Sequence, residues 1–85
     1  MSGNPNFKVT FVIQGDNFDV DVNPNQPIKA GVVKALQKAG ISGNPDEYKV
    51  RTEGGTVLDM NKSFEDQGIT SPTKLFLTKG PGRGG

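Results

Sequence analysis

Strict alternation of apolar and polar residues near the start of the chain is the feature that most constrains its fold. Residues 7–13 place an apolar side chain at every second position, and residues 18–22 repeat this pattern with aspartates in between. A period of two predicts strands with one buried and one solvated face. The residues between the two runs include Gly15 and Asn17, which favour a turn. Together the two runs predict a β-hairpin.

The segment after the hairpin changes to a helical period. Its apolar residues recur three or four positions apart, at Ile28, Val32, Leu36 and Ala39. We expect Asn25 to be the N-cap, with Pro27 in the first turn and Gly40 as the C-terminal cap. Gly31 lies inside this helix at a cost of about 1 kcal/mol relative to alanine. Close packing on a sheet would explain that glycine.

Further strands follow the helix at residues 48–52, 56–58 and 74–78, with a short helical turn between Ser63 and Gly68. A hairpin, a crossover helix and later strands predict an α+β fold. We expect a mixed sheet of four to five strands with one main helix packed on one face. The crossover helix predicts that the first and last strands run parallel in the centre of the sheet.

Composition restricts the classes of function. The chain has 85 residues, enough for one small domain, and it contains no Cys and no His. That removes thiolate nucleophiles, the commonest general base and the usual zinc ligands, so we expect neither an enzyme nor a metal site. A net charge of +1 predicts no nucleic-acid partner. The absence of a long apolar run or signal peptide predicts no membrane partner and a cytoplasmic location.

The order of elements and several local motifs resemble ubiquitin and its relatives over residues 7–85. Residues 58–69 resemble the family's loop of a leucine, an acidic residue and a capped turn. Residues 73–77 resemble its final strand, and Arg83-Gly84-Gly85 resembles its processed end. The divergent, glycine-rich form resembles a bacterial ubiquitin-like protein.

Composition and the resemblance together predict three parts along the chain. A disordered leader covers residues 1–6, a ubiquitin-like β-grasp domain covers residues 7–78, and a flexible Gly-Gly tail covers residues 79–85. The tail has no apolar side chain with which to pack, apart from its proline.

The chemistry that the resemblance implies takes place at the terminal carboxylate of Gly85. An activating enzyme adenylates this group with ATP and takes it as a thioester. A conjugating enzyme transfers it to an amine of a target protein, and a deconjugating peptidase removes it. Because Gly84 and Gly85 have no Cβ, the tail fits a narrow channel and its acyl carbon is open to attack. Arg83 and Gly82 complete the expected recognition tail, and ATP is used by the partner, so the protein needs no cofactor of its own.

A second candidate site lies on the body of the domain. Arg51 occupies the position of ubiquitin's exposed isoleucine on the third strand, so we expect ubiquitin's apolar patch to be absent. Phe76 is out of phase with Leu75 and Leu77 and is expected to face outward. We interpret Arg51, Phe76 and Tyr48 as a candidate partner surface, with a packing role for Phe76 as the alternative.

Three functions remain open on the sequence alone. The first is a protein modifier conjugated through Gly85. The second is a β-grasp sulfur carrier, in which the adenylate becomes a thiocarboxylate, and the third is a domain that binds or assembles without conjugation. The loop at residues 59–69 and the surface lysines favour the modifier. The sheet edges carry no evident guard, which leaves self-association open.

Overall fold

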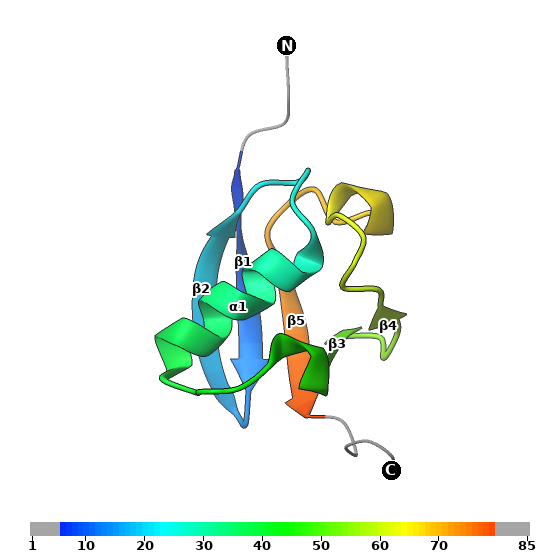
Figure 1. Cartoon of the computed structure of the whole chain (residues 1–85). Coiled ribbons are helices and arrows are strands. Elements are labelled where there is room, and N and C mark those ends of the chain that lie inside the picture. The colour runs from blue at the N-terminus through cyan, green and yellow to red at the C-terminus, as the bar shows by residue number, and fades with distance from the viewer. Residues whose placement is uncertain (1–5, 80–85) are drawn as a thin grey trace.

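The computed structural model describes residues 6–79. In this part of the chain one α-helix lies across one face of a five-stranded sheet (Figure 1). The elements, in chain order, are β1 Phe7–Ile13, β2 Asp16–Val22, α1 Ile28–Ala39, η1 Pro45–Glu47, β3 Tyr48–Thr52, β4 Val57–Leu58, η2 Glu65–Gln67 and β5 Thr73–Lys79. The expected α+β class is confirmed.

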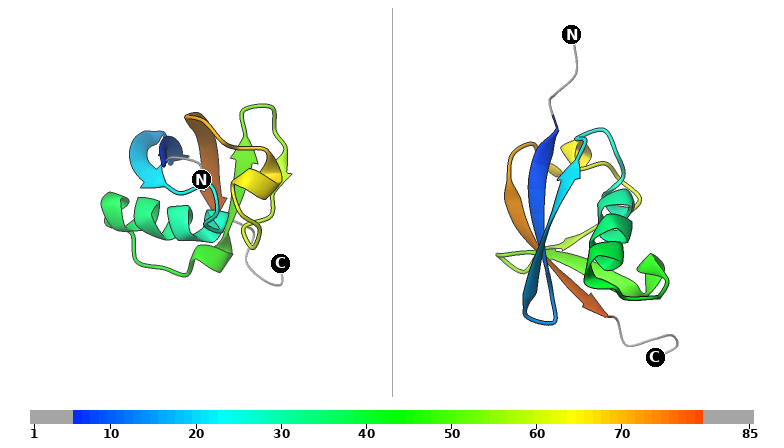
Figure 2. Two further views of the ribbon diagram at one scale, coloured as in Figure 1. Left: turned by 90° about the horizontal axis from the view of Figure 1, so that it is seen from above. Right: turned by 90° about the vertical axis from the view of Figure 1, so that its left-hand side faces the viewer.

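The strands lie in the order β2-β1-β5-β3-β4. β1 and β5 run parallel, with Phe11 opposite Leu75, and every other neighbouring pair is antiparallel. The first and last strands therefore form the central pair of a mixed sheet, as the crossover helix predicted. The two further views in Figure 2 show the helix covering one side of this sheet while the other side stays uncovered.

The hairpin turn is tighter than the sequence predicted. Only Gln14 and Gly15 separate the strands, with φ of 52° and 86°. Two positive φ values match the right-handed twist of the flanking strands, and Gly15 adopts its value without a steric penalty. β2 consequently begins at Asp16 rather than at residue 18, and Phe18 pairs with Phe11.

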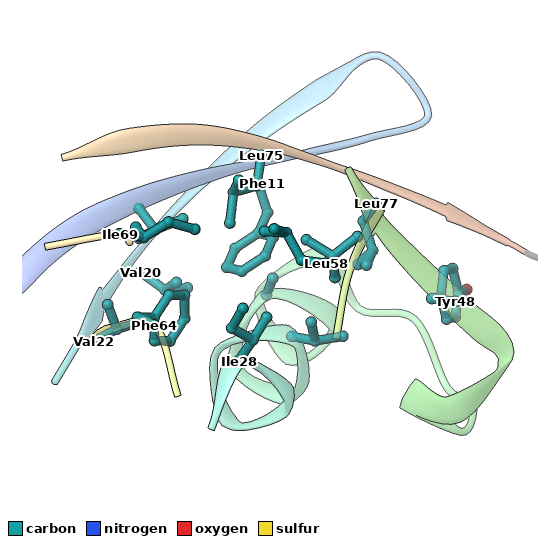
Figure 3. Packing of buried hydrophobic residues seen from close by; sticks show 14 of the residues in the cluster. Phe11, Val20, Val22, Ile28, Tyr48, Leu58, Phe64, Ile69, Leu75 and Leu77 are labelled. Carbon is teal, nitrogen blue, oxygen red and sulfur yellow. The ribbon is translucent and has the colours of Figure 1, made fainter. Parts of the chain in front are cut away.

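The core fills the space between the helix and the inner face of the sheet (Figure 3). Phe11 and Phe64 are its largest fully buried side chains. A Cβ at Gly31 would lie 2.9 Å from Cζ of Phe64 and 3.2 Å from Cγ1 of Val22. The interpretation of Gly31 as a close-packing position is confirmed, because a larger side chain there would collide with the core.

The start of the helix differs from the prediction. Pro27 is the N-cap and has no side-chain cap bond, so the assignment of Asn25 to this role was wrong. The first helical N–H groups instead donate to carbonyls of a distant loop, from Ile28 to Lys62 at 2.9 Å and from Lys29 to Met60 at 3.0 Å. These bonds satisfy donors that a capping side chain would otherwise bind.

The other end of the helix and the short turn follow the prediction. Gly40 ends α1 in the left-handed conformation, and its N–H donates to the carbonyl of Gln37. Ser63 Oγ accepts from the N–H of Asp66 at 3.0 Å, which starts η2 as expected. No helix among residues 6–79 is long and apolar enough to cross a membrane.

Candidate functional site

The outer face of the sheet, opposite the helix, holds two of the three expected surface residues. Phe76 on β5 and Arg51 on β3 are direct cross-strand partners. Phe76 is half-buried between the buried Leu75 and Leu77, and Arg51 is exposed. The structure therefore brings Arg51 and Phe76 together on the face where the strand period predicted Phe76 to lie.

The pair belongs to a row of side chains across four strands. Val12 on β1 lies opposite Phe76, and Val57 on β4 lies opposite Arg51. We call Val12, Phe76, Arg51 and Val57 the outer row. Val57 is 50% exposed and is the one large apolar side chain classed as exposed in residues 6–79. The outer row is therefore an apolar strip interrupted by one guanidinium group.

Sequence reasoning missed Val12 and Val57. A signal for Val12 was present, because it occupies a polar position of the alternating run at residues 7–13. An apolar residue at a solvated position of a strand indicates either packing or recognition. Val57 gave a weaker signal, since a two-residue strand shows no period.

Tyr48 does not belong to this surface. It is 7% exposed, in phase with the buried Val50, and faces the helix side of the sheet among the core residues (Figure 3). Placing Tyr48 with Arg51 and Phe76 was therefore wrong. The reason is the strand period itself: residues 48 and 50 share one face, and residue 51 lies on the other.

Charges on the outer face are divided between its two sides. Lys49 and Lys74 are exposed on β3 and β5, on the same side of the strands as Arg51 and Phe76. Asp19 and Asp21 are exposed on β2, and Asp19 Oδ1 accepts from Thr10 Oγ1 at 2.7 Å. The part of the outer row over β3 and β5 therefore has a basic surround, while on β2 the two aspartates lie beside the exposed Lys8, the cross-strand partner of Asp21.

The expected conjugation and tail residues Gly82, Arg83, Gly84 and Gly85 lie outside the described residues, as do residues 1–5 of the expected leader. β5 ends at Lys79, one residue into the span expected for the tail. Lys79 lies opposite Tyr48, and its Nζ is 3.8 Å from Oε1 of Glu47. The expected tail therefore follows the central strand β5 directly in the sequence.

The described residues offer no arrangement for metal binding. Between residues 6 and 79, no three side chains among His, Cys, Asp and Glu gather where they could hold an ion.

Solved structures with a similar fold are ubiquitin and ubiquitin-like domains. A de novo designed protein based on ubiquitin matches with a TM-score of 0.79 and 22% identity, over 94% of this chain and 95% of that chain. Ubiquitin from Caldiarchaeum subterraneum matches with a TM-score of 0.72 and 21% identity, over 95% of this chain and 100% of that chain. The chain has the ubiquitin-like fold, as its resemblance predicted.

A curated relative comes from a bacterium. The uncharacterized protein y4jI of Sinorhizobium fredii is 33% identical over 72 residues, which cover 84% of this chain and 55% of that protein. The chain thus spans about half the length of the curated relative it matches. The family model described as "Protein of Unknown function (DUF2604)" matches residues 2–85. The chain therefore belongs to this family, and its fold is that of ubiquitin.

Proposed function

We propose that the protein is a ubiquitin-like modifier that is joined to amines of target proteins through the carboxyl group of Gly85. The proposal rests on one observation, the order of two segments along the chain. A ubiquitin-like body ends in the central strand β5, and the sequence continues from Lys79 directly into Gly-Pro-Gly-Arg-Gly-Gly. The proposal holds whether Gly85 is encoded last or is exposed by cleavage of a longer chain.

The transfer needs four displacements at the carboxyl group of Gly85. Its carboxylate oxygen attacks the α-phosphate of ATP, and pyrophosphate leaves. A thiolate of the activating enzyme then attacks the acyl carbon and AMP leaves. A thiolate of the conjugating enzyme displaces the first thiol, and an amine of the target displaces the second and forms an amide. This chain contains no Cys and no His, so every nucleophile and base comes from a partner. Gly84 and Gly85 leave the acyl carbon unshielded by side chains.

The outer row is the proposed docking surface for the activating and conjugating enzymes. Phe76 lies three residues before Lys79 on β5, so an enzyme bound at Phe76 is roughly 10 Å from the start of the tail. The apolar strip supplies burial, and the neighbouring Lys49 and Lys74 favour an acidic partner surface. Binding at this face leaves the whole tail free to extend toward an active-site cysteine.

Peptide mapping after conjugation tests the proposal. The full chain is incubated with ATP, an acceptor protein, a conjugating enzyme and an activating enzyme of the source bacterium whose ATP–pyrophosphate exchange has been demonstrated. Trypsin cleaves after Arg83, so a modified lysine retains Gly84 and Gly85 as a tag that mass spectrometry detects. We expect this tag with the intact chain and none with a chain that lacks Gly85.

Two other outcomes would support one of the two competing functions instead. Replacement of one oxygen by sulfur at the carboxyl terminus, without lysine tags, would identify a sulfur carrier. Failure of the chain to stimulate pyrophosphate exchange by the active enzyme would leave a domain that acts by binding alone.

A further inference from the structure

The loop between β4 and η2 holds the start of α1 in place. The N–H of Lys29 donates to the carbonyl of Met60 at 3.0 Å, and the N–H of Ile28 donates to that of Lys62 at 2.9 Å. Figure 2 shows this loop beside the first turn of the helix. Pro27, the N-cap, contributes no side-chain bond, so the loop carbonyls are the acceptors for these first N–H groups. A change of the loop at residue 60 therefore acts directly on the helix.

The side chain of Met60 contacts the core while its backbone is fixed in a turn. The thioether packs against the hydrophobic cluster and is half-buried. In the turn, the N–H of Lys62 donates to the carbonyl of Asp59 at 3.1 Å, and the N–H of Asn61 donates to Asp59 Oδ1 at 2.9 Å. The apolar contact of Met60 and the bond that its carbonyl accepts from Lys29 therefore depend on one residue in one fixed geometry.

Met60 also carries the only sulfur atom between residues 6 and 79, because the chain has no Cys and its other methionine is Met1. A half-buried thioether is accessible to a small oxidant such as hydrogen peroxide. The sulfur attacks one peroxide oxygen with a lone pair, and the O–O bond breaks. That oxygen stays on the sulfur and its proton passes to the departing hydroxide, so the thioether is oxidised to a sulfoxide and peroxide is reduced to water. A flexible apolar side chain thereby becomes polar.

We propose that Met60 is an oxidation site through which peroxide loosens the start of α1. The sulfoxide oxygen needs hydrogen-bond donors that an apolar core does not supply, so the modified side chain turns toward water. This rotation moves the Met60 carbonyl out of line with the N–H of Lys29 and weakens their bond. Methionine sulfoxide reductases reverse the modification, so the site acts as a switch.

The remainder of the loop is held by other contacts. The N–H of Phe64 donates to the carbonyl of Gln26 at 3.2 Å, and the N–H of Glu65 donates to that of Pro24 at 2.9 Å. Phe64 itself is fully buried. None of these bonds includes Met60, so oxidation opens the first turn of α1 without unfolding the domain.

Peptide mapping of the full chain after treatment with hydrogen peroxide measures whether the site reacts. Trypsin releases Met60 in the peptide of residues 52–62 and Met1 in that of residues 1–8, so mass spectrometry counts the two oxidations separately. We expect Met60 in the folded chain to react at no less than about a tenth of its rate in the chain unfolded in urea. A lower rate would overturn the proposal, because the fold would then shield the sulfur.

Amide hydrogen exchange of the oxidised chain measures the effect on the helix. We expect exchange at Ile28 and Lys29 to become about tenfold faster, and treatment with the reductases to restore it. The N–H groups of Gly40 and Ile41, which donate to carbonyls at the other end of α1, should not change. Unchanged exchange at Ile28 and Lys29 would overturn the proposal. Equal acceleration at both ends would also overturn it, because oxidation would then act on the whole domain.

Two variants separate the sulfur of Met60 from other targets of peroxide. Met60→Leu keeps an apolar side chain of similar volume, and peroxide should leave its exchange at Ile28 and Lys29 unaltered. Acceleration in this variant would assign the effect to another group, and the proposal would fail. Met60→Gln places a polar side chain at the site and should reproduce the faster exchange without oxidant; normal exchange there would count against the proposed cause. The experiment uses neither Gly85 nor an activating enzyme, so its outcome is independent of the conjugation proposal.

Discussion

The inner and outer faces of the sheet are built from alternate residues of the same strands. On β5, Leu75 and Leu77 lie under the helix and are at most 3% exposed, while Phe76 between them is half-buried on the open face. On β1, Phe11 is fully buried, and its neighbour Val12 is half-buried. The inner residues account for folding, because their burial removes apolar surface from water. Apolar residues on the open face are only partly removed from water, and we propose that they serve binding.

Truncation of the inner face should produce the largest effect. Phe11 on β1 is fully buried between the sheet and the helix, so Phe11→Ala should lower the free energy of unfolding by about 3–5 kcal/mol. Urea denaturation followed by circular dichroism measures this change. A loss below about 1 kcal/mol would contradict the assignment of stability to the inner face.

An added methyl group at the helix–sheet contact should have the next largest effect. In Gly31→Ala the new Cβ would lie 2.9 Å from Cζ of Phe64. Overpacking costs about 1–3 kcal/mol, and better helix propensity returns about 1 kcal/mol, so we expect a net loss of up to about 2 kcal/mol. Thermal and urea unfolding measure whether the substitution lowers or raises the free energy of unfolding.

A second substitution identifies the cause of that loss. Phe64→Leu removes the Cζ atom that the new methyl group would meet. In a double-mutant cycle, Gly31→Ala should therefore cost less in the Phe64→Leu background than in the natural chain. Equal costs in both backgrounds would mean that the collision is not with Phe64.

Most of the fold could be predicted because its signals are local. The alternation of apolar and polar residues predicted β1, β2 and β3. The helical period of apolar residues predicted α1, with Gly40 at its end. The start of the helix could not be predicted in the same way. Its N–H groups donate to carbonyls of Met60 and Lys62, a contact between segments more than thirty residues apart that no local motif encodes.

The candidate site was predicted in part. The period of two placed Phe76 on the outer face, and Arg51 was identified through the resemblance to ubiquitin. The same period, applied to Tyr48 and Val50, would have assigned Tyr48 to the core. Val57 was missed because its place in the outer row depends on strand pairing, which the sequence does not reveal. The functional roles of Arg51 and Phe76 stay predictions.

Truncation at the outer face should affect binding more than folding. Phe76→Ala removes a half-buried ring, and we expect a loss of unfolding free energy of about 1 kcal/mol, well below that for Phe11→Ala. We expect the same variant to be transferred to target lysines more slowly, with a raised KM of the activating enzyme for the chain. A stability loss equal to that of Phe11→Ala would place Phe76 in the core and remove the contrast between the faces.

The smallest effect on folding should come from the charged member of the outer row. Arg51 is exposed, and neither ion pair found within residues 6–79 includes it, so Arg51→Ala should change the unfolding free energy by less than about 0.5 kcal/mol. If an acidic partner docks there, the variant should nevertheless associate more slowly, and the association rate should depend less steeply on salt. Arg51→Lys keeps the charge and should preserve most of the salt dependence. Equal association of all three proteins at low and high salt would show that Arg51 is only a solvated residue and that binding at the outer row is purely apolar.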